Sequence, residues 1–479
     1  MHFEKSMKTP SISALDKKYV WHPFTQMADW AKEDNLVIES GRGIYLKDTN
    51  GKEYIDGVSS LWVNVHGHRK SAIDNAIKKQ LGKIAHSTYL GLAHAPGALL
   101  AERLIRLAPR GLERVFYSDS GSTAVEIALK MAFRYWRQKK NPSRGKTMFL
   151  SLKNAYHGDT IGSVSVGGMD LFGEKFRPLL FKTLFAPSSY CYRCPHRTKT
   201  SAAAPRVSRK TRAGGFRIHC ISVGCKGECL KAAEDIFKKH SRRIAAAVAE
   251  PMIQGAAGML TMPPGYFKAF ADLCRRYGTL LIADEVATGF GRTGKMFACE
   301  IENVRPDIMC VAKGITGGYL PLAATLVSEK IHRAFLGRYE DFRTFFHGHT
   351  YTANPLACAA AIANLEIFKK EKTIGKLPAK IAALSAALQK LSSENSFVGD
   401  TRQLGLMAGI EIVKDKKTGR MFAVEEKTAI KICRRARDYG VILRPLGNVI
   451  VIMPPLSVTV GQIEKIINAV GKSIRDVLP

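Results

Sequence analysis

Three short stretches of the sequence place chemically useful side chains directly after runs of apolar residues. Lys313 ends the run IMCVAK, and a lysine taken out of water can lose its proton and become a nucleophilic amine. Asp284 ends the run LLIAD, where a carboxylate needs a cationic partner. Gly121 and Ser122 follow the run RVFYSDS and open a helical pattern, and free N–H groups at the start of a helix bind phosphate. A phosphate cradle, a carboxylate for a pyridine nitrogen and an amine for a Schiff base are together the requirements of pyridoxal phosphate.

Each of these stretches has an ordinary explanation when it is taken alone. Gly121 and Ser122 also suit a well-capped helix, and Asp284 also suits a structural ion pair. The combination favours a cofactor site, because all three stretches end predicted strands, and α/β folds bind ligands at that edge of the sheet. The motif GFGRTG at 289–294 matches a dinucleotide fingerprint, but the preceding strand pattern ends several residues earlier and no helix start follows. We therefore do not expect a dinucleotide site.

The elements that would position these side chains alternate between strands and helices. Residues 36–66 contain short β-like runs and the hairpin pair Asn50-Gly51, which indicate a small N-terminal sheet. From about 71 to 340, helical patterns alternate with short apolar runs, which predicts an α/β fold with a mostly parallel sheet. We expect an N-terminal segment that joins the small domain (1–70), a large cofactor-binding domain (71–345) and a smaller C-terminal α+β domain (346–479).

Residues 188–232 interrupt this alternation with a basic segment that contains cysteines. Between Arg193 and Arg217 it has eight Lys or Arg residues and no acid, a composition that cannot bury a core of its own. We predict an inserted loop that is disordered at its centre. The C-x-x-C and C-x-x-x-C pairs at its two ends suit a structural zinc ion, with reduced thiols or disulfides as the alternatives. The expected zinc ligands are Cys191, Cys194, Cys225 and Cys229.

The chain of 479 residues carries a formal net charge of +32, which makes nucleic acid a candidate partner. The cations form no single stripe interleaved with aromatic residues, so we expect them to be spread over solvated faces, and we do not favour nucleic acid as a partner. The first residues show no apolar leader pattern, and no apolar run is long enough to cross a bilayer. We therefore expect a cytoplasmic protein with no membrane partner.

Longer motifs give a more specific indication. The stretch LLIADEVATGFGRTGKMFACE, with PDIMCVAKGITGGYLPLAA after it, resembles the signature of the class III, subgroup II, fold-type I aminotransferases, and the likeness covers nearly the whole chain outside 188–232. The resemblance implies a fold-type I transferase that depends on pyridoxal phosphate and acts as a homodimer with shared active sites. Further motifs are similar to the biotin-biosynthesis branch, which converts 8-amino-7-oxononanoate to 7,8-diaminononanoate: WHPFTQM at 21–27, DSGSTAVEIALKMA at 119–132, AYHGDT at 155–160, HGHTYTANPLACAAA at 347–361 and LRPLGNVIVIMPP at 443–455.

The resemblance also implies roles for individual residues. Lys313 would form the Schiff base, Asp284 would face the ring nitrogen and Tyr156 would stack on the ring. Arg444 would bind the carboxylate of the keto acid, a geometry that suits a forked guanidinium. Without the motifs, Tyr156 and Trp62 would count as core aromatics and Arg444 as a surface arginine. The other implied contacts are Gly121, Ser122, His157 and Gly158 for the cofactor, His349 and Thr350 for its phosphate from the second subunit, and Gly348 and Trp62 for the substrate.

Two positions of the implied substrate pocket depart from the relatives that use S-adenosylmethionine as amino donor. Phe24 stands where they have a tyrosine, and Leu61 stands where they have the first of two tryptophans. These changes remove a hydroxyl group and an indole ring from the donor side of the pocket. S-Adenosylmethionine stays the expected donor, and lysine is the alternative. Two other functions stay open, namely another class III transaminase for an ω-amino acid or a diamine, and a protein that binds nucleic acid or another polyanion.

Overall fold

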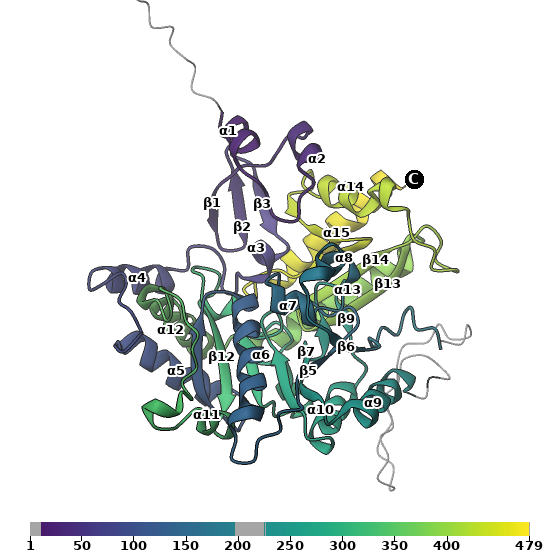
Figure 1. Cartoon of the computed structure of the whole chain (residues 1–479). Coiled ribbons are helices and arrows are strands. Elements are labelled where there is room, and N and C mark those ends of the chain that lie inside the picture. The colour runs from purple at the N-terminus through teal and green to yellow at the C-terminus, as the bar shows by residue number, and fades with distance from the viewer. Residues whose placement is uncertain (1–10, 197–224, 226, 479) are drawn as a thin grey trace, which may run out of the picture.

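A seven-stranded sheet forms the centre of the computed structural model, which describes residues 11–196, 225 and 227–478 (Figure 1). The strand order is β4-β12-β11-β10-β7-β5-β6. Strand β12 runs antiparallel to both of its neighbours, and the other neighbouring strands pair in parallel. The predicted α/β arrangement with a mostly parallel sheet is therefore confirmed. The strands are β4 (Leu112–Ser118), β5 (Met148–Leu152), β6 (Thr183–Ala186), β7 (Ile244–Ala249), β10 (Leu280–Asp284), β11 (Ile308–Val311) and β12 (Ala323–Ser328).

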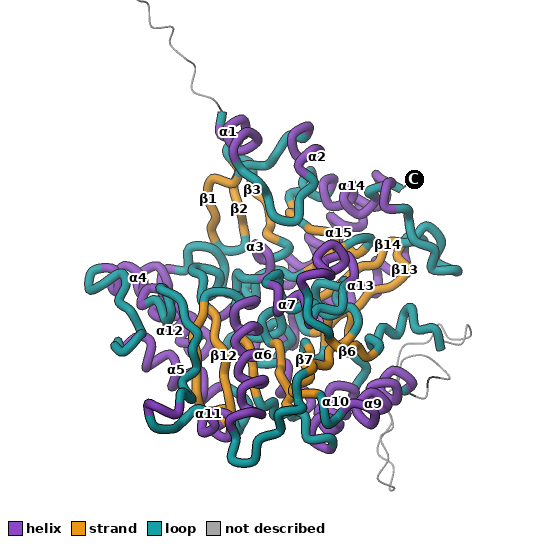
Figure 2. Tube along the Cα trace, viewed as in Figure 1, coloured by secondary structure: helices purple, strands orange, loops and turns teal. Residues whose placement is uncertain are grey.

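Helices pack against both faces of this sheet; Figure 2 draws the helices in purple and the strands in orange. In β10, Leu280 and Ile282 pack in one hydrophobic cluster with residues of α6 (Gly121–Gln138). Leu281 and Ala283 pack in a second cluster with residues of α9 (Glu228–His240) and α10 (Tyr266–Arg276). Alternate residues of a strand point to opposite faces, so a continuous apolar run serves two helical layers.

Further helices extend the large domain away from the sheet. Helix α5 (Ala95–Leu107) packs against β4, and α12 (Pro355–Lys370) packs against both α5 and α4 (Ser71–Leu81). Helix α11 (Glu329–Ala334) follows β12 and contacts α6. The connection between β5 and β6 contains α7 (Ile161–Val166) and α8 (Asp170–Gly173), and a two-stranded pair follows β7, formed by β8 (Ile253–Gln254) and β9 (Leu260–Thr261).

The N-terminal sheet contains strands from both ends of the chain. It follows the short helices α1 (Ile12–Tyr19) and α2 (Met27–Lys32). The order is β1-β2-β3-β15, where β15 (Val441–Ile442) pairs in parallel with β3. The predicted hairpin is confirmed, because β2 and β3 pair antiparallel and Gly51 between them has a φ of +86°. The other strands are β1 (Ile38–Arg42), β2 (Tyr45–Asp48) and β3 (Glu53–Asp56).

A separate antiparallel sheet with the order β13-β14-β17-β16 lies in the C-terminal part of the chain, beside the yellow and light-green helices of Figure 1. Its strands are β13 (Val398–Leu404), β14 (Met407–Ile412), β16 (Arg444–Leu446) and β17 (Val449–Ile452). The helices are α13 (Leu377–Glu394), α14 (Thr428–Arg435) and α15 (Val460–Val477), and α15 packs against the other two. Among the helices of the described ranges, none is both long and apolar enough to cross a membrane. The predicted domain boundaries and the cytoplasmic location stay predictions.

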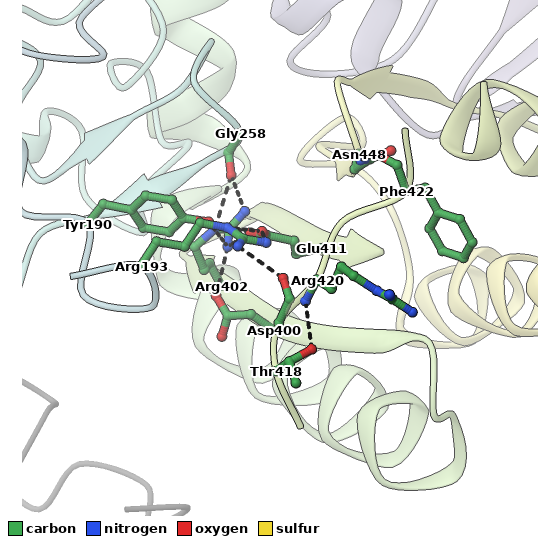
Figure 3. A network of polar contacts seen from close by, with 11 residues as sticks. Tyr190, Arg193, Gly258, Asp400, Arg402, Glu411, Thr418, Arg420, Phe422 and Asn448 are labelled. Carbon is green, nitrogen blue, oxygen red and sulfur yellow. Dashed lines mark hydrogen bonds and ion pairs between the residues drawn. The ribbon is translucent and has the colours of Figure 1, made fainter. Parts of the chain in front are cut away.

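A buried polar network joins the chain after β6 to this C-terminal sheet (Figure 3). The guanidinium of Arg402 donates to the carbonyl of Gly258 at 2.9 and 3.1 Å and to Glu411 at 2.6 Å. Tyr190 donates its hydroxyl to the same carboxylate oxygen, and Arg193 donates to the other oxygen of Glu411 at 2.7 Å. Buried charges are tolerated when they are paired in this way. The network therefore fixes the entry to the predicted insert.

The predicted insert 188–232 joins neighbouring structural features at both of its ends. Its first residues belong to the network, and residues 228–232 belong to α9, which begins at Glu228 because the helical apolar pattern already starts there. The predicted disordered centre falls on residues outside the described ranges.

Candidate active site

A cavity of about 160 Å³ lies at the ends of β4, β7, β10 and β11. This edge is where the carboxyl ends of the parallel strands meet and where α/β sheets bind their ligands. The cavity brings together the three stretches singled out in the sequence. Its walls consist of Trp62, Ser120, Gly121, Ser122, Tyr156, His157, Gly158, Glu250, Asp284, Val286, Ala287 and Lys313.

Asp284 and His157 form a buried pair at the base of this cavity. Nδ1 of His157 lies 2.7 Å from one carboxylate oxygen of Asp284, and the backbone N–H of Val286 donates to the other oxygen at 3.1 Å. Both side chains are almost completely shielded from solvent. The cationic or polar partner that Asp284 requires therefore comes from the turn after β5, and the carboxylate is fixed in one orientation.

Lys313 leaves the end of β11 in a strained conformation. Its φ of 47° lies in the left-handed region, which a residue other than glycine adopts only when its surroundings hold it there. Burial lowers the pKa of Lys313 from 10.5 to about 8, although Asp284 and Glu250 act in the opposite direction. Its ammonium nitrogen lies 4.6 Å from the ring centre of Trp62. At physiological pH more of the Lys313 amine is therefore neutral and nucleophilic than in an exposed lysine, although the protonated form still predominates.

The start of α6 forms a cradle that only small residues permit. Ser120 caps the helix, and its hydroxyl accepts from the N–H of Thr123 at 3.3 Å. A Cβ atom on Gly158 would lie 1.8 Å from Oγ of Ser122, and one on Gly121 would lie 2.5 Å from Val286. The open N–H groups of the first helical turn suit an anion, and the cradle therefore fits the phosphate of pyridoxal phosphate.

Trp62 reaches the cavity from a left-handed turn. The four residues of α3 (Ser59–Trp62) all have positive φ angles, which costs energy for residues that carry a Cβ atom. The turn is held by hydrogen bonds, because Ser60 donates its N–H to Asp56 at 2.9 Å and Ser59 donates its hydroxyl to the carbonyl of Met453 at 2.6 Å. It buries Trp62 and leaves Leu61 47% exposed, so the two neighbours have different surroundings.

Tyr156 forms the wall of the cavity that follows β5. Its hydroxyl donates to Asp159 at 2.6 Å, and its ring contacts Phe172 at a centroid distance of 5.7 Å. Phe172 in turn contacts Phe24 at 5.5 Å. Phe24 therefore reaches the neighbourhood of Tyr156 through one intervening ring and is itself 57% exposed.

Comparison with known proteins decides the family. The model of the family "Aminotransferase class-III" matches residues 27–474. This chain is a class III aminotransferase. It is 48% identical to the adenosylmethionine-8-amino-7-oxononanoate aminotransferase of Geobacter sulfurreducens, with 98% of each chain covered.

Two solved structures resemble this class III aminotransferase over nearly its whole length. One is the adenosylmethionine-8-amino-7-oxononanoate aminotransferase of Methanocaldococcus jannaschii, with 41% identity, a TM-score of 0.88 and coverage of 98% of this chain and 99% of that chain. The other is an amine transaminase from an uncultivated Pseudomonas species in the PLP-bound internal aldimine form, with 36% identity, a TM-score of 0.87 and coverage of 96% and 99%. The fold-type I assignment and the pyridoxal phosphate cofactor are therefore supported.

Several predicted residues of the aminotransferase lie outside the described cavity. Gly348, His349 and Thr350 belong to an irregular segment before α12, and Arg444 is exposed at the start of β16. Their predicted roles are not tested by the geometry of one subunit. The structure brings the other predicted cofactor residues and Trp62 together in the cavity. Phe24 and Leu61 do not line it, and their side chains are exposed to solvent.

The sequence interpretation missed three residues near the site. Glu250 ends the apolar run AAAVAE, the same signal that identified Asp284. Asp159 donates its backbone N–H to Oγ of Ser122 at 2.7 Å, and its place in the motif AYHGDT was the available signal. Arg292 of GFGRTG is buried and donates to the carbonyls of Asn64 and Pro454 at 2.6 and 2.9 Å, so this motif ties distant segments together.

The predicted zinc site is not supported. A zinc ion requires about four ligand atoms converging within roughly 2.0–2.3 Å of one point. Within residues 11–196, 225 and 227–478, which include Cys191, Cys194, Cys225 and Cys229, no group of three or more His, Cys, Asp or Glu side chains is arranged to hold a metal ion.

Proposed function

We propose that the protein transfers an amino group to 8-amino-7-oxononanoate and produces 7,8-diaminononanoate for biotin biosynthesis, with S-adenosylmethionine as the donor. The observation that carries the proposal is the cavity in which Lys313 faces the pair of Asp284 and His157. The substrate is supported by relatives such as the one from Geobacter sulfurreducens, named for this reaction, at 48% identity over nearly the full chain. These findings do not favour another transaminase or a polyanion-binding protein.

The cofactor supplies one part of the chemistry. When bound, pyridoxal phosphate withdraws the electrons of the C–H bond that is broken at the amino carbon. Gly121, Ser122 and the N–H groups of the first turn of α6 would hold its phosphate. Asp284 would hold a proton on the pyridine nitrogen, and His157 fixes the orientation of that carboxylate through their 2.7 Å contact.

Lys313 would anchor the cofactor and then move protons. Displaced by the donor amine, its free Nζ would remove the proton from the amino carbon and return a proton during the second half of the reaction. A pKa of about 8 suits both steps, because the group can take up and release a proton near physiological pH. Tyr156 would confine the cofactor ring, and Trp62 covers the Lys313 nitrogen at 4.6 Å.

Substrate recognition would use residues outside the base of the cavity. Arg444 would bind the carboxylate of 8-amino-7-oxononanoate through its forked guanidinium. Phe24 and Leu61 would contact the donor. They offer apolar surface and no hydroxyl or indole N–H, and lysine therefore stays the alternative donor to be measured.

We also propose a homodimer that completes each site. The segments 84–92 and 346–354 lie side by side, because the rings of His86 and Tyr351 are 4.9 Å apart and Asn354 donates to the carbonyl of Ala85 at 3.3 Å. Both segments expose large apolar side chains, with Leu90 at 89% and Tyr351 at 62% exposure. Such a surface suits a self-complementary contact. His349 and Thr350 would then reach the phosphate of the partner's cofactor, and Gly348 would line its pocket.

A direct assay tests the proposal. The purified protein with pyridoxal phosphate and 8-amino-7-oxononanoate is offered S-adenosylmethionine or lysine, and 7,8-diaminononanoate is measured by mass spectrometry. We expect product with S-adenosylmethionine and a covalent mark on Lys313 after borohydride reduction and peptide mapping. Turnover with lysine alone would correct the donor. Absence of product with both donors, or undiminished activity of Lys313→Ala, would contradict the proposed function.

A further inference from the structure

A second carboxylate faces Lys313, and the reaction described above gives it no role. Glu250 follows β7, is buried and lines the same cavity as Lys313 and Asp284. We propose that Glu250 is a positioning residue that holds two walls of the cavity in place and supplies a second negative charge facing Lys313. The inference rests on the proposed function, because it concerns the amine that anchors the cofactor.

The hydrogen bonds of Glu250 connect the two walls. One carboxylate oxygen accepts the backbone N–H of Tyr156 at 3.1 Å, and the other accepts the N–H of Gly255 at 2.9 Å. Gly255 packs against the indole of Trp62, since a Cβ atom placed on it would lie 3.4 Å from Cζ3 of that ring. A single carboxylate therefore sets the distance between the Tyr156 wall and the wall that supports Trp62.

The turn that begins at Gly255 is held at its far end as well. Arg402 donates to the carbonyl of Gly258 at 2.9 and 3.1 Å, as Figure 3 shows. Gly258 has a φ of +101°, a conformation that a residue with a side chain would adopt only with strain. With both ends fixed, the turn can transmit the position of Glu250 to Trp62.

The charge of Glu250 acts on Lys313 together with its neighbours. Burial raises the pKa of Glu250 to about 7, with Asp284 acting in the same direction and His157 opposing it. Above that pH the carboxylate is ionised and favours the protonated form of the Lys313 nitrogen. The other charged or titratable groups that act on Lys313 or Glu250 are Asp284, His157, Asp159 and Arg292.

The test is a pH titration of the visible absorbance of the protein loaded with pyridoxal phosphate, without substrate. In Glu250→Gln the negative charge is lost, and the midpoint of the titration is expected to fall by about one pH unit or more. In Glu250→Gln one of the two backbone N–H donors would face the N–H₂ group of the glutamine, and this could prevent folding. Glu250→Met, which brings no N–H group, is therefore the second uncharged variant, and the midpoint is measured in the variant that folds. A midpoint equal to that of the wild type in a folded variant overturns the proposal.

Glu285→Gln is the matched control. Glu285 is also fully buried and accepts two backbone N–H groups, from Ala298 at 3.0 Å and Cys299 at 2.8 Å, but it does not line the cavity. We expect this variant to keep the wild-type midpoint. An equal fall in Glu285→Gln would show that loss of any buried carboxylate produces the shift, and this result would also overturn the proposal.

Glu250→Asp separates position from charge. It keeps the carboxylate and shortens its reach, so we expect a midpoint near that of the wild type and faster loss of pyridoxal phosphate on dilution. Wild-type retention of the cofactor would refute the positioning part. If wild-type protein itself shows no visible absorbance with pyridoxal phosphate, the proposed function fails, whereas a normal wild-type spectrum with an unshifted Glu250→Gln midpoint removes only the inference about Glu250.

Discussion

Replacing Lys313 with methionine is expected to abolish transamination and at the same time to stabilise the cofactor-free protein. Burial lowers the pKa of Lys313 from 10.5 to about 8, despite the opposing effects of Asp284 and Glu250. At neutral pH the folded protein therefore carries an ammonium group that is poorly solvated, whereas the unfolded chain exposes the same group to water. Methionine is uncharged and of similar length, and it can pack against the indole of Trp62.

The magnitude follows from the pKa difference between the folded and unfolded states. The fall from 10.5 to about 8 corresponds to about 3 kcal/mol at roughly 1.4 kcal/mol per unit. Water in the cavity screens part of this cost, so we expect a gain in unfolding free energy of about 2 kcal/mol. The cost is absent above pH 10.5, where lysine is neutral in both states, grows as the pH falls towards 8 and is complete below 8.

Urea unfolding of the cofactor-free proteins at several pH values measures this gain. Lys146→Met is the control, because burial also lowers the pKa of Lys146 to about 8, but its ammonium donates to the carbonyls of Ser241 and Ile244 at 2.9 Å each. Removing that lysine leaves two acceptors without their donor, so we expect a loss of stability of about 1 kcal/mol or more. A Lys313→Met protein that is no more stable than the wild type at neutral pH, or whose gain does not shrink towards high pH, would refute the reasoning.

Three further substitutions test other parts of the structure. Gly158→Ala places a Cβ atom 1.8 Å from Oγ of Ser122 and is expected to weaken binding of pyridoxal phosphate by about tenfold or more, measured by absorbance titration; unchanged affinity would contradict the cradle. Glu411→Gln removes one of the two carboxylates paired with Arg402, the other being Asp400, and is expected to lower the unfolding free energy by about 2 kcal/mol in urea; a change near zero would show that the network does not stabilise the fold. Arg444→Ala is expected to raise KM for 8-amino-7-oxononanoate about tenfold with a smaller effect on kcat, and an unchanged KM would exclude its proposed contact.

The strands and the base of the site were predictable because both depend on one local pattern. A short apolar run that ends in a polar residue marks a buried strand and its carboxyl end, and this pattern identified Asp284 and Lys313. The same pattern marks Glu250, which the sequence interpretation did not single out. Gly158 was identified from its motif, and the structure adds the physical reason, a clash with Ser122.

The remaining features depend on contacts between distant parts of the chain. The buried guanidinium of Arg292 donates to the carbonyls of Asn64 and Pro454, which lie far from it in the sequence. No local pattern therefore reveals that this arginine binds the backbone of other segments. The zinc prediction relied on cysteine spacing. Spacing shows that four thiols could come near one another, but it does not show that they point to one common metal position. The role of Thr350 depends on a second subunit, which the sequence indicates only through family resemblance.

The reversed direction of β12 limits how the reactive amine can move. Strands β11 and β12 are antiparallel neighbours, so the chain leaves the sheet and returns to it at the same edge. The connection between Val311 and Ala323, which contains Lys313, is therefore held at both ends by adjacent strands. The residues directly after Lys313, which are Gly314, Ile315 and Thr316, are buried, so we expect the amine to move mainly by rotation of its own methylene chain. A larger pocket is therefore better obtained by substitutions around Trp62 or Phe172, with the connection between Val311 and Ala323 kept at its native length.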